Sequence, residues 1–566
     1  MKLVECVPNI SEGRRPEIYQ KIANAVTAVP GVTLLDVDPG VETNRTVITF
    51  VGEPEAVLEA AYKLAAAAFE LIDMRTHKGA HPRIGAVDVV PFVPVTGVTM
   101  EECVVLARRL GERLASEFSV PVYLYEYAAS APHRRNLSDI RAGEYEGLAE
   151  KLKDPAWQPD FGPAVFNPKL GACVVGARKF LVAYNVNLNT TDRRLANRVA
   201  LDVREKGRMK RDERGEVIRN EKGEPVYEPG LLKSVKAIGW TIPEYGCAQI
   251  SMNLTDLDVT PLHVAFDTCD EKARERGLRV TGSELVGLVP KSALLEAGRH
   301  YLARMGKSRG VPEGAVLHVA IRTLGLSEVK PFDPEKRIIE YRLAPPQPLA
   351  TMSVKAFVDE LSTESPAPGG GTVSALCGAL AAALAAMVAN LSFDKKGFED
   401  RRQALERIAM RAQELKDAML FAVDEDTRAF DALLAAMRLP KATPEEQTQR
   451  SQAVREATLK AIAVPLSVLE ACPEILDLCL QVADIGLAAS LSDAGVGAQV
   501  ARAAGAGAYQ NVCINLASLD DRETARKLLA RADAAMEALR NKHREAEEKI
   551  LATLRRQAEE GQTPRS

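Results

Sequence analysis

The segment Leu343-Ala-Pro-Pro-Gln-Pro-Leu-Ala-Thr351 divides the chain into two halves of different character. It is uncharged and holds three prolines, a composition typical of a semi-rigid linker between domains. Before this segment, strand-like and helix-like runs alternate. Beyond it, strand signals nearly vanish, and Ala- and Leu-rich helical patterns continue to about Gln557. The sequence therefore predicts an α+β half, a linker at residues 331–351 and an all-α helical bundle.

The N-terminal half repeats one order of secondary structure. The first copy predicts strands at residues 4–8, 32–37, 47–51, 87–95 and 120–125, and helices at 18–29, 53–74 and 101–116. The second predicts strands at 180–186, 235–240 and 248–254, an extended stretch at 278–289, and helices at 194–204, 262–276 and 293–305. The core order is β-α-β-β-α-β, with one added helix and strand in the first copy, and a similar order follows in the second. Two such units in tandem indicate two ferredoxin-like subdomains, residues 1–177 and 178–330. The charge-dense residues 205–229 are interpreted as an exposed hairpin insertion.

The overall composition favours a soluble protein of several domains. The chain has 566 residues, of which 46% are apolar and 27% charged. Its formal net charge of −4 gives no support for a nucleic-acid partner. The nine cysteines are scattered and form no Cys-x-x-Cys pair. That pattern indicates reduced thiols in a cytoplasmic protein, not a disulfide framework or a zinc site.

Two segments bear on a membrane or secretory interpretation. The N-terminus, Met-Lys-Leu-Val-Glu-Cys-Val-Pro-Asn9, lacks the apolar core and small-residue cleavage site of a signal peptide. Residues 373–391 are uncharged and nominally long enough to span a bilayer. They are mostly alanine, however, which is only weakly apolar. We therefore expect a close-packed helix inside a soluble all-α domain, and no membrane partner.

The loop His77-Lys-Gly-Ala-His81-Pro-Arg83-Ile-Gly-Ala-Val-Asp88 is the first candidate site. It gathers two of only seven histidines, two basic side chains and an acid just before a predicted strand. The His-x-x-x-His spacing is that of some metal sites. The loop lacks the glutamate of the zinc-protease motif, and Gly79 and Pro82 would break the helix that aligns the rings. We predict no metal, and a purely structural loop is the alternative.

Three further polar strings lie at predicted strand ends. They are Val4-Glu-Cys-Val-Pro-Asn-Ile-Ser-Glu-Gly13, Asp36-Val-Asp-Pro-Gly-Val-Glu-Thr-Asn-Arg-Thr46 and Asp160-Phe-Gly-Pro-Ala-Val-Phe-Asn-Pro-Lys-Leu-Gly171. Together with the histidine loop, these strings resemble the formiminotransferase domain of glutamate formiminotransferases over about residues 1–330. The resemblance implies folate bound between two ferredoxin-like subdomains and His81 as the catalytic acid/base. It also implies one folate-contacting stretch: Gly162, Pro163, Ala164, Val165, Phe166, Asn167, Pro168, Lys169, Leu170 and Gly171.

Formimino transfer needs a proton carrier and carboxylate binders. An amine must lose a proton to attack the formimino carbon, and the departing nitrogen must gain one. An imidazole with an unperturbed pKa of about 6.5 can do both near neutrality. The substrate carboxylates would suit arginine forks. The substrate-binding candidates are Asp38 (for the pterin edge), Asn44, Arg45, Arg83 and, by charge alone, Arg178; structural pairing or turn capping is the alternative for each.

The helical half offers a second group of candidates. Gly369, Gly370 and Gly371 precede the Ala-rich helix and leave backbone N–H groups free for an anion, although a flexible helix entry is the alternative. In residues 415–437, apolar positions recur at steps of three or four and place Asp426 on the side expected to be buried. A carboxylate there is costly unless it is paired or functional.

Neighbouring positions are less distinctive. Asp424 falls on a mixed and more polar line of the same helix. Asn511 and Asn515 lie one turn apart on an apolar segment, and both are polar exceptions there. Asp493 precedes a helix predicted to begin near Val496 and could act in the site or simply as its N-cap.

Four strings in this half resemble the formimidoyltetrahydrofolate cyclodeaminases, an all-helical dimeric family. They are Ala367-Pro-Gly-Gly-Gly371, Val423-Asp-Glu-Asp-Thr-Arg-Ala-Phe430, Arg438-Leu-Pro-Lys441 and Ser492-Asp-Ala-Gly495. The match covers about residues 352–545 and leaves residues 546–566 as a charged tail. It implies Asp426 as the catalytic aspartate, with Gly369, Gly370, Gly371, Asp493 and Asn511 around it.

The order of the two halves is that of the bifunctional formimidoyltransferase-cyclodeaminase family. The resemblance implies that tetrahydrofolate, as a polyglutamate, receives the formimino group of N-formimino-glutamate. The product then cyclises to 5,10-methenyltetrahydrofolate with loss of ammonia, as in histidine breakdown. We expect a cytoplasmic homo-oligomer built on a helical-domain dimer. A methenyltetrahydrofolate cyclohydrolase-like helical domain, a folate-binding scaffold with one inactive domain, and formimino-glycine as donor are the alternatives.

Overall fold

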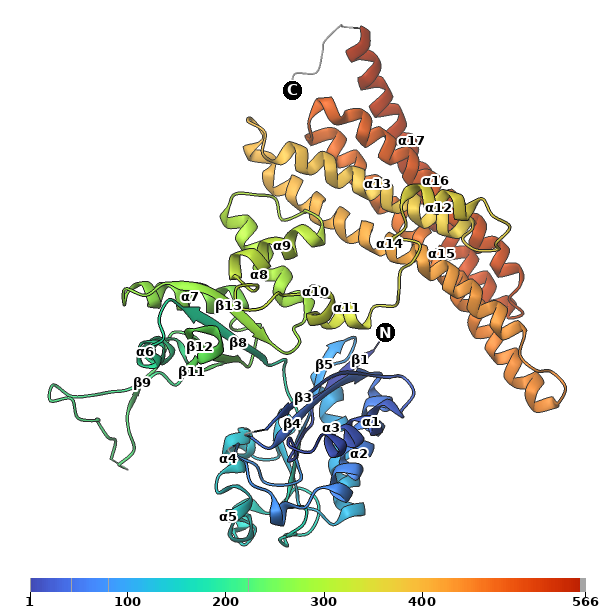
Figure 1. Cartoon of the computed structure of the whole chain (residues 1–566). Coiled ribbons are helices and arrows are strands. Elements are labelled where there is room, and N and C mark those ends of the chain that lie inside the picture. The colour runs from blue at the N-terminus through green and yellow to red at the C-terminus, as the bar shows by residue number, and fades with distance from the viewer. Residues whose placement is uncertain (1, 42, 80, 222, 560–566) are drawn as a thin grey trace. The chain divides into compact units, whose positions relative to one another are not determined.

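The structure is a computed structural model that describes residues 2–41, 43–79, 81–221 and 223–559. It separates into two compact units. The first comprises Met1–Ala293 and Leu324–Leu343, and the second comprises Leu294–Thr323 and Ala344–Ser566. Figure 1 shows strands only in the first unit and long helices in the second. The predicted α+β half followed by an all-α bundle is confirmed.

The first unit opens with a seven-stranded sheet. Its strands are β1 (Leu3–Cys6), β2 (Asn9–Ile10), β3 (Val32–Gly40), β4 (Arg45–Gly52), β5 (Val87–Thr96), β6 (Val122–Glu126) and β7 (Cys173–Ala177). β1 and β2 act as one interrupted strand, and the spatial order is β3-β4-β1/β2-β5-β7-β6. The first four positions follow the ferredoxin-like order that the repeat predicted.

β7 was not predicted. It runs parallel to both β5 and β6 and lies between them. β7 has only five residues and comes shortly after the Gly- and Pro-rich segment 160–171. So short an apolar run beside a loop-like segment does not predict a strand by its pattern.

The two faces of this sheet have different coverings. α1 (Pro16–Thr27), α2 (Pro54–Leu71) and α3 (Met100–Phe118) bury one face and form the main core with it. Because side chains alternate along a strand, Val4 and Cys6 point into that core while Glu5 points to the other face. α4 (Leu137–Arg141) and α5 (Glu144–Lys151) cover part of this second face. The remainder lines a cavity.

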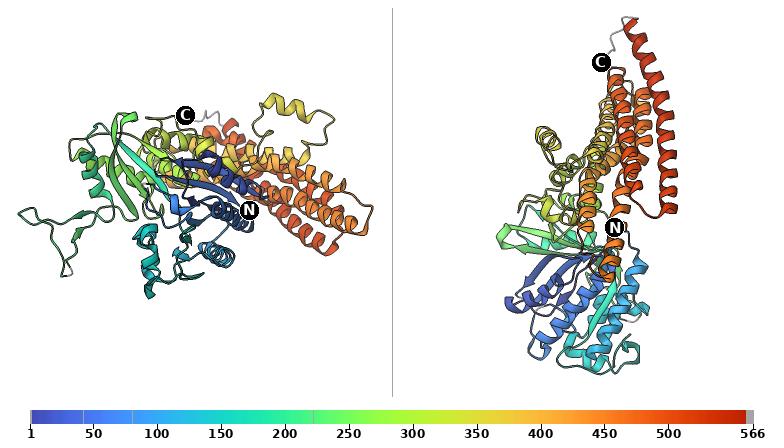
Figure 2. Two further views of the ribbon diagram at one scale, coloured as in Figure 1. Left: turned by 60° about the horizontal axis from the view of Figure 1, so that its bottom comes forward. Right: turned by 90° about the vertical axis from the view of Figure 1, so that its right-hand side faces the viewer.

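The second subdomain repeats the ferredoxin-like order. Its strands are β8 (Val182–Leu188), β11 (Val235–Ile242), β12 (Cys247–Leu254) and β13 (Val280–Val286), and its helices include α6 (Arg193–Val203) and α7 (Leu262–Arg274). The antiparallel order β11-β12-β8-β13 matches the prediction. The predicted hairpin insertion is also confirmed, since β9 (Arg208–Met209) pairs with β10 (Tyr227–Glu228) in a thin excursion (Figures 1 and 2).

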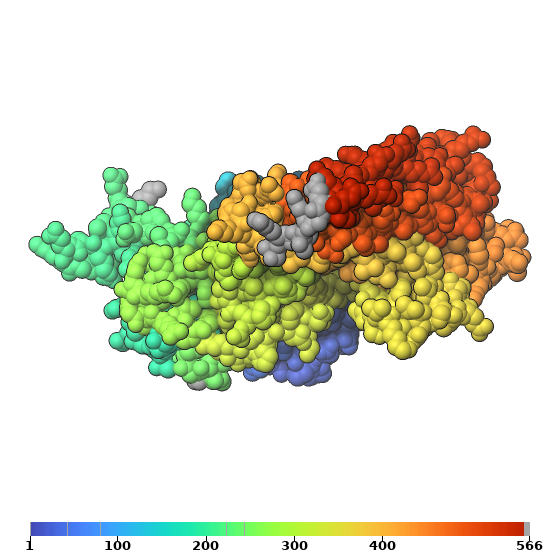
Figure 3. All heavy atoms as spheres, turned by 90° about the horizontal axis from the view of Figure 1, so that it is seen from above, coloured from blue at the N-terminus to red at the C-terminus, as the bar shows by residue number. Residues whose placement is uncertain are grey.

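The second unit is a bundle of long helices. They are α12 (Val354–Leu361), α13 (Gly370–Phe393), α14 (Arg402–Met437), α15 (Pro444–Ile485), α16 (Leu491–Ala517) and α17 (Arg522–Glu559), joined by most of α8 (Lys291–Arg304) and α9 (Glu313–Leu324). α13, α14, α15 and α16 pack closely together, and α17 packs on α15 and α16. Figure 3 shows the spheres of α17 in red on the surface of this unit, as its charge pattern predicted.

α13 is the one helix, among the residues described, that is long and apolar enough to cross a membrane. Its mean hydropathy over the best window is 2.0, and 61% of that window is buried inside the unit. Alanines on two of its sides, including Ala381, Ala382 and Ala385, are fully buried against the neighbouring helices. Small side chains allow such close approach, and α13 is a core helix, as predicted.

Candidate functional site

A cavity of about 700 Å³ opens on the uncovered face of the first sheet. Its walls come from β1 to β6 on one side and from residues 178–183 and 284–288 on the other, so it lies between the two subdomains of the first unit. Charged side chains of both signs line it: Glu5, Asp36, Asp38, Glu284, Arg45, Arg141, Arg178, Lys330 and Arg337. His81 is the histidine that lines it.

His81 is held as a neutral ring. Its Nδ1 lies 2.7 Å from the carbonyl oxygen of Pro82, which accepts the ring N–H. In that tautomer Nε2 carries the lone pair, and it contacts Nη1 of Arg45. Burial, and then the charge of Arg45, lower the pKa of His81 below 6.5. At neutral pH the ring can therefore act as a base.

Arg45 stands beside this base at the start of β4. Its Nη2 donates to Oδ1 of Asn9, and its Nη1 contacts the ring of His81. Its Nε is buried without a partner among the described residues. Burial lowers its pKa to about 10, while Asp88 opposes that shift, so Arg45 stays charged at neutral pH. An unpaired donor on a buried cation is suited to an incoming carboxylate.

Asn44 organises the histidine loop. Its Oδ1 accepts from the backbone N–H of Gly13 at 3.0 Å, and its Nδ2 donates to the carbonyl of Lys78 at 3.1 Å. Nε2 of His77 lies 2.8 Å from the carbonyl oxygen of Asn44 itself. A side chain on Gly79 would place its Cβ 2.8 Å from the carbonyl carbon of Thr43, so only glycine fits there. These contacts favour a positioning role for Asn44, whose substrate contact stays a prediction.

Arg83 lies outside the cavity wall. Its guanidinium donates to Glu144 and Glu146 at 2.6 to 2.8 Å, and its Nε donates to Nδ1 of His77 at 3.3 Å. The residue is 5% exposed. These partners use its donors and tie α5 to the loop, so the geometry favours a structural role. Binding of a substrate carboxylate by Arg83 stays a prediction.

Asp38 and Asp36 line the cavity from β3. Both are exposed to it, and the pKa of Asp38 is raised, first by partial desolvation in the cavity wall and then by the charge of Asp36. Its proposed contact with the pterin stays a prediction.

One ion pair beside His81 was missed from the sequence. Asp88 on β5 is fully buried, accepts from the backbone N–H of Ile84 at 3.0 Å and pairs with Arg141 of α4. Arg141 lines the cavity. The two residues are far apart in sequence, and the short α4 has no pattern that would have singled out its arginine.

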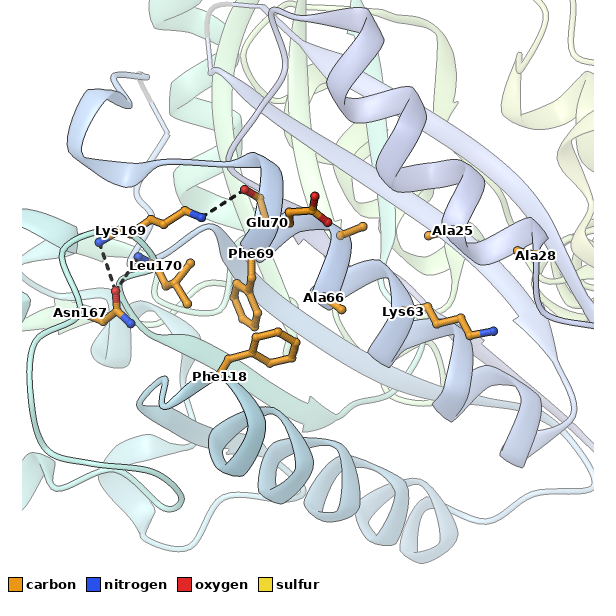
Figure 4. A pocket seen from close by; sticks show the side chains of 11 residues that line it. Ala25, Ala28, Lys63, Ala66, Phe69, Glu70, Phe118, Asn167, Lys169 and Leu170 are labelled. Carbon is orange, nitrogen blue, oxygen red and sulfur yellow. Dashed lines mark hydrogen bonds between the residues drawn. The ribbon is translucent and has the colours of Figure 1, made fainter.

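The stretch Gly162–Gly171 does not line this cavity. Asn167, Lys169 and Leu170 border a different hollow of about 760 Å³ beside the helices α1, α2 and α3, shown in Figure 4. There Nζ of Lys169 donates to the carbonyl of Glu70 at 3.2 Å. Gly162 and Gly171 have φ values of +83° and +71°, which explains glycine at both. Folate binding by the ten residues of this stretch stays a prediction.

A second polar cluster forms in the helical unit. Asp426 of α14 is half-buried and accepts from Oγ1 of Thr372, on α13, at 3.0 Å. Burial raises its pKa above the usual value for aspartate, and the bond from Thr372 opposes that shift. A Cβ on Gly371 would lie 2.6 Å from the carboxyl carbon of Asp426. The glycine thus lets the first turn of α13 approach the carboxylate.

Asn511 and Gly370 complete this cluster from α16 and α13. A Cβ on Gly370 would lie 3.4 Å from Nδ2 of Asn511, which donates to the carbonyl of Gly507 at 2.8 Å. Gly369 is the N-cap of α13. The structure therefore brings together the glycines, Asp426 and Asn511. Thr372 was not among the candidates, although it stands next to them in sequence.

Two carboxylates in this unit differ from what their patterns indicated. Asp424 is buried although its helical line is mixed and more polar: it is 2% exposed and accepts from the backbone N–H groups of Leu349 and Ala350 at 2.9 and 3.0 Å. It therefore fixes the Pro-rich segment onto α14. Asp493 is not an N-cap, because α16 begins earlier, with Ser490 as its cap. Asp493 lies in the first turn, half-buried, and its role in the site stays a prediction.

Within the described ranges, no group of three or more His, Cys, Asp or Glu side chains is arranged to hold a metal ion.

Three family models together match most of the chain. "Formiminotransferase domain, N-terminal subdomain" matches residues 3–178, "Formiminotransferase domain" matches 183–344, and "Formiminotransferase-cyclodeaminase" matches 353–534. The first match spans the seven-stranded sheet. The second spans most of β8 to β13 and also Leu294–Thr323, which the structure groups with the helical unit, and the third covers α12 to part of α17.

Three curated relatives illustrate the similarity. The formimidoyltransferase-cyclodeaminase of Rattus norvegicus is 46% identical over 92% of this chain and 93% of its own. The glutamate formimidoyltransferase of Streptococcus pyogenes serotype M1 is 39% identical over 53% of this chain and 93% of its own. The methenyltetrahydrofolate cyclohydrolase of Methylorubrum extorquens is 37% identical over 31% of this chain and 85% of its own. The chain belongs to the formimidoyltransferase-cyclodeaminase family, bifunctional folate enzymes of histidine metabolism.

Proposed function

We propose that the cavity of the first unit transfers the formimino group of N-formimino-L-glutamate to N5 of tetrahydrofolate. The products are 5-formiminotetrahydrofolate and L-glutamate. The observation that carries the assignment is the neutral His81 ring, presented to the cavity between Arg45 and the carbonyl of Pro82. N5 attacks the formimino carbon, and its proton passes to Nε2 once Arg45 moves onto a substrate carboxylate. The ring then returns the proton to the departing glutamate nitrogen.

Cationic side chains give the cavity its preference for a dicarboxylate and a folate tail. Arg45 and Arg141 stand near the base and suit the carboxylates of formimino-glutamate. Lys330 and Arg337 line the same cavity and suit the glutamate tail of the folate, including a polyglutamate. Formimino-glycine has one carboxylate fewer and would leave one of these partners unused.

For the helical unit, we propose cyclisation of 5-formiminotetrahydrofolate at Asp426. N10 attacks the formimino carbon and loses its proton, the carbon–nitrogen bond to the terminal amino group breaks, and that group leaves as ammonia. A half-buried carboxylate with a raised pKa can take the first proton and deliver it to the leaving group. Thr372 holds the carboxylate in place. The product is 5,10-methenyltetrahydrofolate.

A cyclohydrolase activity is the second candidate for this unit. The similarity to a methenyltetrahydrofolate cyclohydrolase over the helical half favours it. That reaction adds water to a methenyl-folate and releases no ammonia. Incubating the protein with formimino-glutamate and tetrahydrofolate, while following ammonia and methenyl-folate absorbance, separates the two. Equal amounts of both products support the cyclodeaminase, and loss of added methenyl-folate without ammonia supports the rival.

We further propose that the protein is a cytoplasmic homo-oligomer in which helical units pair. Leu380, Met387 and Leu391 lie one or two turns apart on α13 and are 52%, 37% and 48% exposed. Apolar side chains aligned on one side of a helix are suited to another copy of the same surface. Sedimentation of the intact protein and of a Leu380→Glu variant tests the pairing, and an unchanged mass for the variant would contradict it.

A further inference from the structure

Glu5 is a buried carboxylate that neither proposed reaction uses. It lies on β1 with 3% of its surface exposed and lines the cavity that holds His81. Among the residues that the structure describes, none donates a hydrogen bond to its side chain. A buried carboxylate without donors is costly, because it loses its water and gains nothing in return. A ligand that brings N–H groups would remove that cost.

The surroundings of Glu5 determine what kind of ligand it accepts. The charges that act on it are Arg178, which favours its ionised form, and Glu340 of α11 (Ile339–Leu343), which opposes it. Burial dominates and raises the pKa of Glu5 to about 7. A substrate carboxylate would be repelled from this end. A neutral group with two N–H donors would be bound and would favour the ionised form.

The distance from the base fits a fused ring system. Arg45 contacts His81 and donates to the side chain of Asn9. Glu5 lies four residues before Asn9, on the same face of the interrupted strand formed by β1 and β2. Four residues of extended strand span roughly 13 Å. That length suits a bicyclic pterin with a hydrogen-bonding group at each end. The wall between the two ends is mainly apolar and suits a flat ring: Val7, Val47, Val89 and Pro91.

We propose that the Glu5 carboxylate accepts two parallel hydrogen bonds from the 2-amino group and N3–H of the tetrahydrofolate pterin, and so sets N5 against His81. The inference rests on the proposed transferase function of the cavity. Glutamate's ammonium is the other candidate donor. In the proposed reaction, however, the glutamate nitrogen receives its proton from His81, and it therefore lies at the opposite end of the cavity. Asp38 and Asp36 are less suited to this role, because they are exposed and already solvated.

The test compares Glu5→Gln with the wild type in the full-length protein, using tetrahydrofolate and its 2-desamino-2-methyl analogue. The glutamine keeps the shape but turns an N–H group toward one pterin donor. Wild type should prefer tetrahydrofolate over the analogue by about 100-fold in kcat/KM, and the variant by less than about 10-fold. The KM for formimino-glutamate should change by less than about twofold, since its binding groups are untouched.

A matched control is Asp36→Asn, which removes one negative charge from the same cavity at an exposed position. It should keep the wild-type preference between the two folates. A Glu5→Gln variant that keeps it too overturns the proposal. Wild type without any transferase activity would instead refute the function of the cavity, and calorimetric binding of 5-formyltetrahydrofolate to wild type and Glu5→Gln would still test Glu5 by itself.

If Glu5→Gln does not fold, the wild-type protein still provides a test. Donors from the pterin should lower the pKa of Glu5 in the complex, so binding releases a proton when the free carboxyl is protonated. The affinity for 5-formyltetrahydrofolate should rise as pH increases toward about 7 and level off above it. Affinity that stays constant from pH 6 to 8, by titration calorimetry, overturns the proposal.

Discussion

In the two polar clusters, burial shifts the pKa of the central side chain in opposite directions. In the first unit, burial lowers the pKa of a histidine, whose charged form is the protonated one. In the helical unit, burial raises the pKa of an aspartate, whose charged form is the deprotonated one. Desolvation disfavours whichever form carries charge, so one physical cause moves both groups toward neutrality. For the pKa of each side chain, the depth of burial matters more than the fold class that surrounds it.

The clusters differ in how they hold that side chain. His81 lies on a loop. Its ring contacts Arg45 and donates to the carbonyl of Pro82, and Asn44 holds the same loop by donating to the carbonyl of Lys78. Asp426 lies on a long helix, and its position depends on the close approach of Gly371 and on the bond from Thr372. A polar network supports the first site, and close packing supports the second.

The largest effect should come from removing the loop base. His81→Ala should reduce formimino transfer by about 10²- to 10⁴-fold, because the variant loses the ring that takes the proton and returns it. Ammonia release from supplied 5-formiminotetrahydrofolate should stay at the wild-type rate. Loss of both activities in a folded variant would contradict separate sites, and full transfer activity would remove His81 from the mechanism.

Asp426→Asn should produce the converse result. The amide keeps the shape but cannot accept a proton, so ring closure should slow by about 10²- to 10⁴-fold. Transfer should continue, and 5-formiminotetrahydrofolate should accumulate, which chromatography of quenched reactions can measure. Methenyl-folate formation at the wild-type rate would show that another group carries the proton.

Gly371→Ala tests whether the helical site depends on close packing. The added methyl would overlap the Asp426 carboxyl, so it should cost about 1–3 kcal/mol of stability and lower cyclodeaminase activity by about tenfold, while transfer is unchanged. Gly314→Ala in α9 is the matched control, since an added Cβ there meets no atom within 4 Å. Thermal denaturation and ammonia release measure both variants. Equal behaviour would refute the packing argument.

Arg45→Gln tests how the loop site sets the pKa of its histidine. The charge of Arg45 disfavours the imidazolium, so its removal should raise the pKa of His81 toward 6.5. Transfer requires the neutral ring and is lost as pH falls through that pKa. The acid limb of the kcat/KM profile, which reports the free enzyme, should therefore move to higher pH in the variant. An unmoved limb would assign it to another group.

The sequence predicted the arrangement of the first unit well, because the order of strands and helices in a ferredoxin-like fold follows from local hydrophobic periodicity. Alternating and helical runs identified β8, β11, β12, β13, α6 and α7 of the second subdomain, and tandem repetition indicated the fold. β7 escaped because its run is short and follows a glycine-rich loop. The long strings of polar residues marked His81, and helical periodicity marked Asp426.

The remaining features depend on contacts between distant segments. Nothing local to Arg141 indicates that it pairs with Asp88, and nothing local to Glu5 shows that it faces a cavity. The periodicity of α14 places Asp424 on a mixed and more polar line. The segment that buries its carboxylate lies more than seventy residues away, so the local pattern of α14 contains no sign of it. The burial of a side chain in a tertiary contact depends on its distant partner, and the hydrophobic pattern of its own helix does not predict it.

The smallest expected effect concerns whether the two sites share their intermediate. The first cluster makes a folate that the second consumes, and a polyglutamate tail can stay bound to basic side chains while the pterin is exchanged. With polyglutamylated tetrahydrofolate, methenyl-folate should therefore appear without a lag in stopped-flow absorbance. With the monoglutamate, free intermediate should build up first.

Higher salt should lengthen the lag for the polyglutamate, because exposed charge attraction is screened. Cutting the chain between residues 343 and 351 and mixing the halves should restore the lag unless the halves remain associated, which gel filtration would detect. Equal lags for both substrates in the intact protein would mean that each site draws its folate independently from solution.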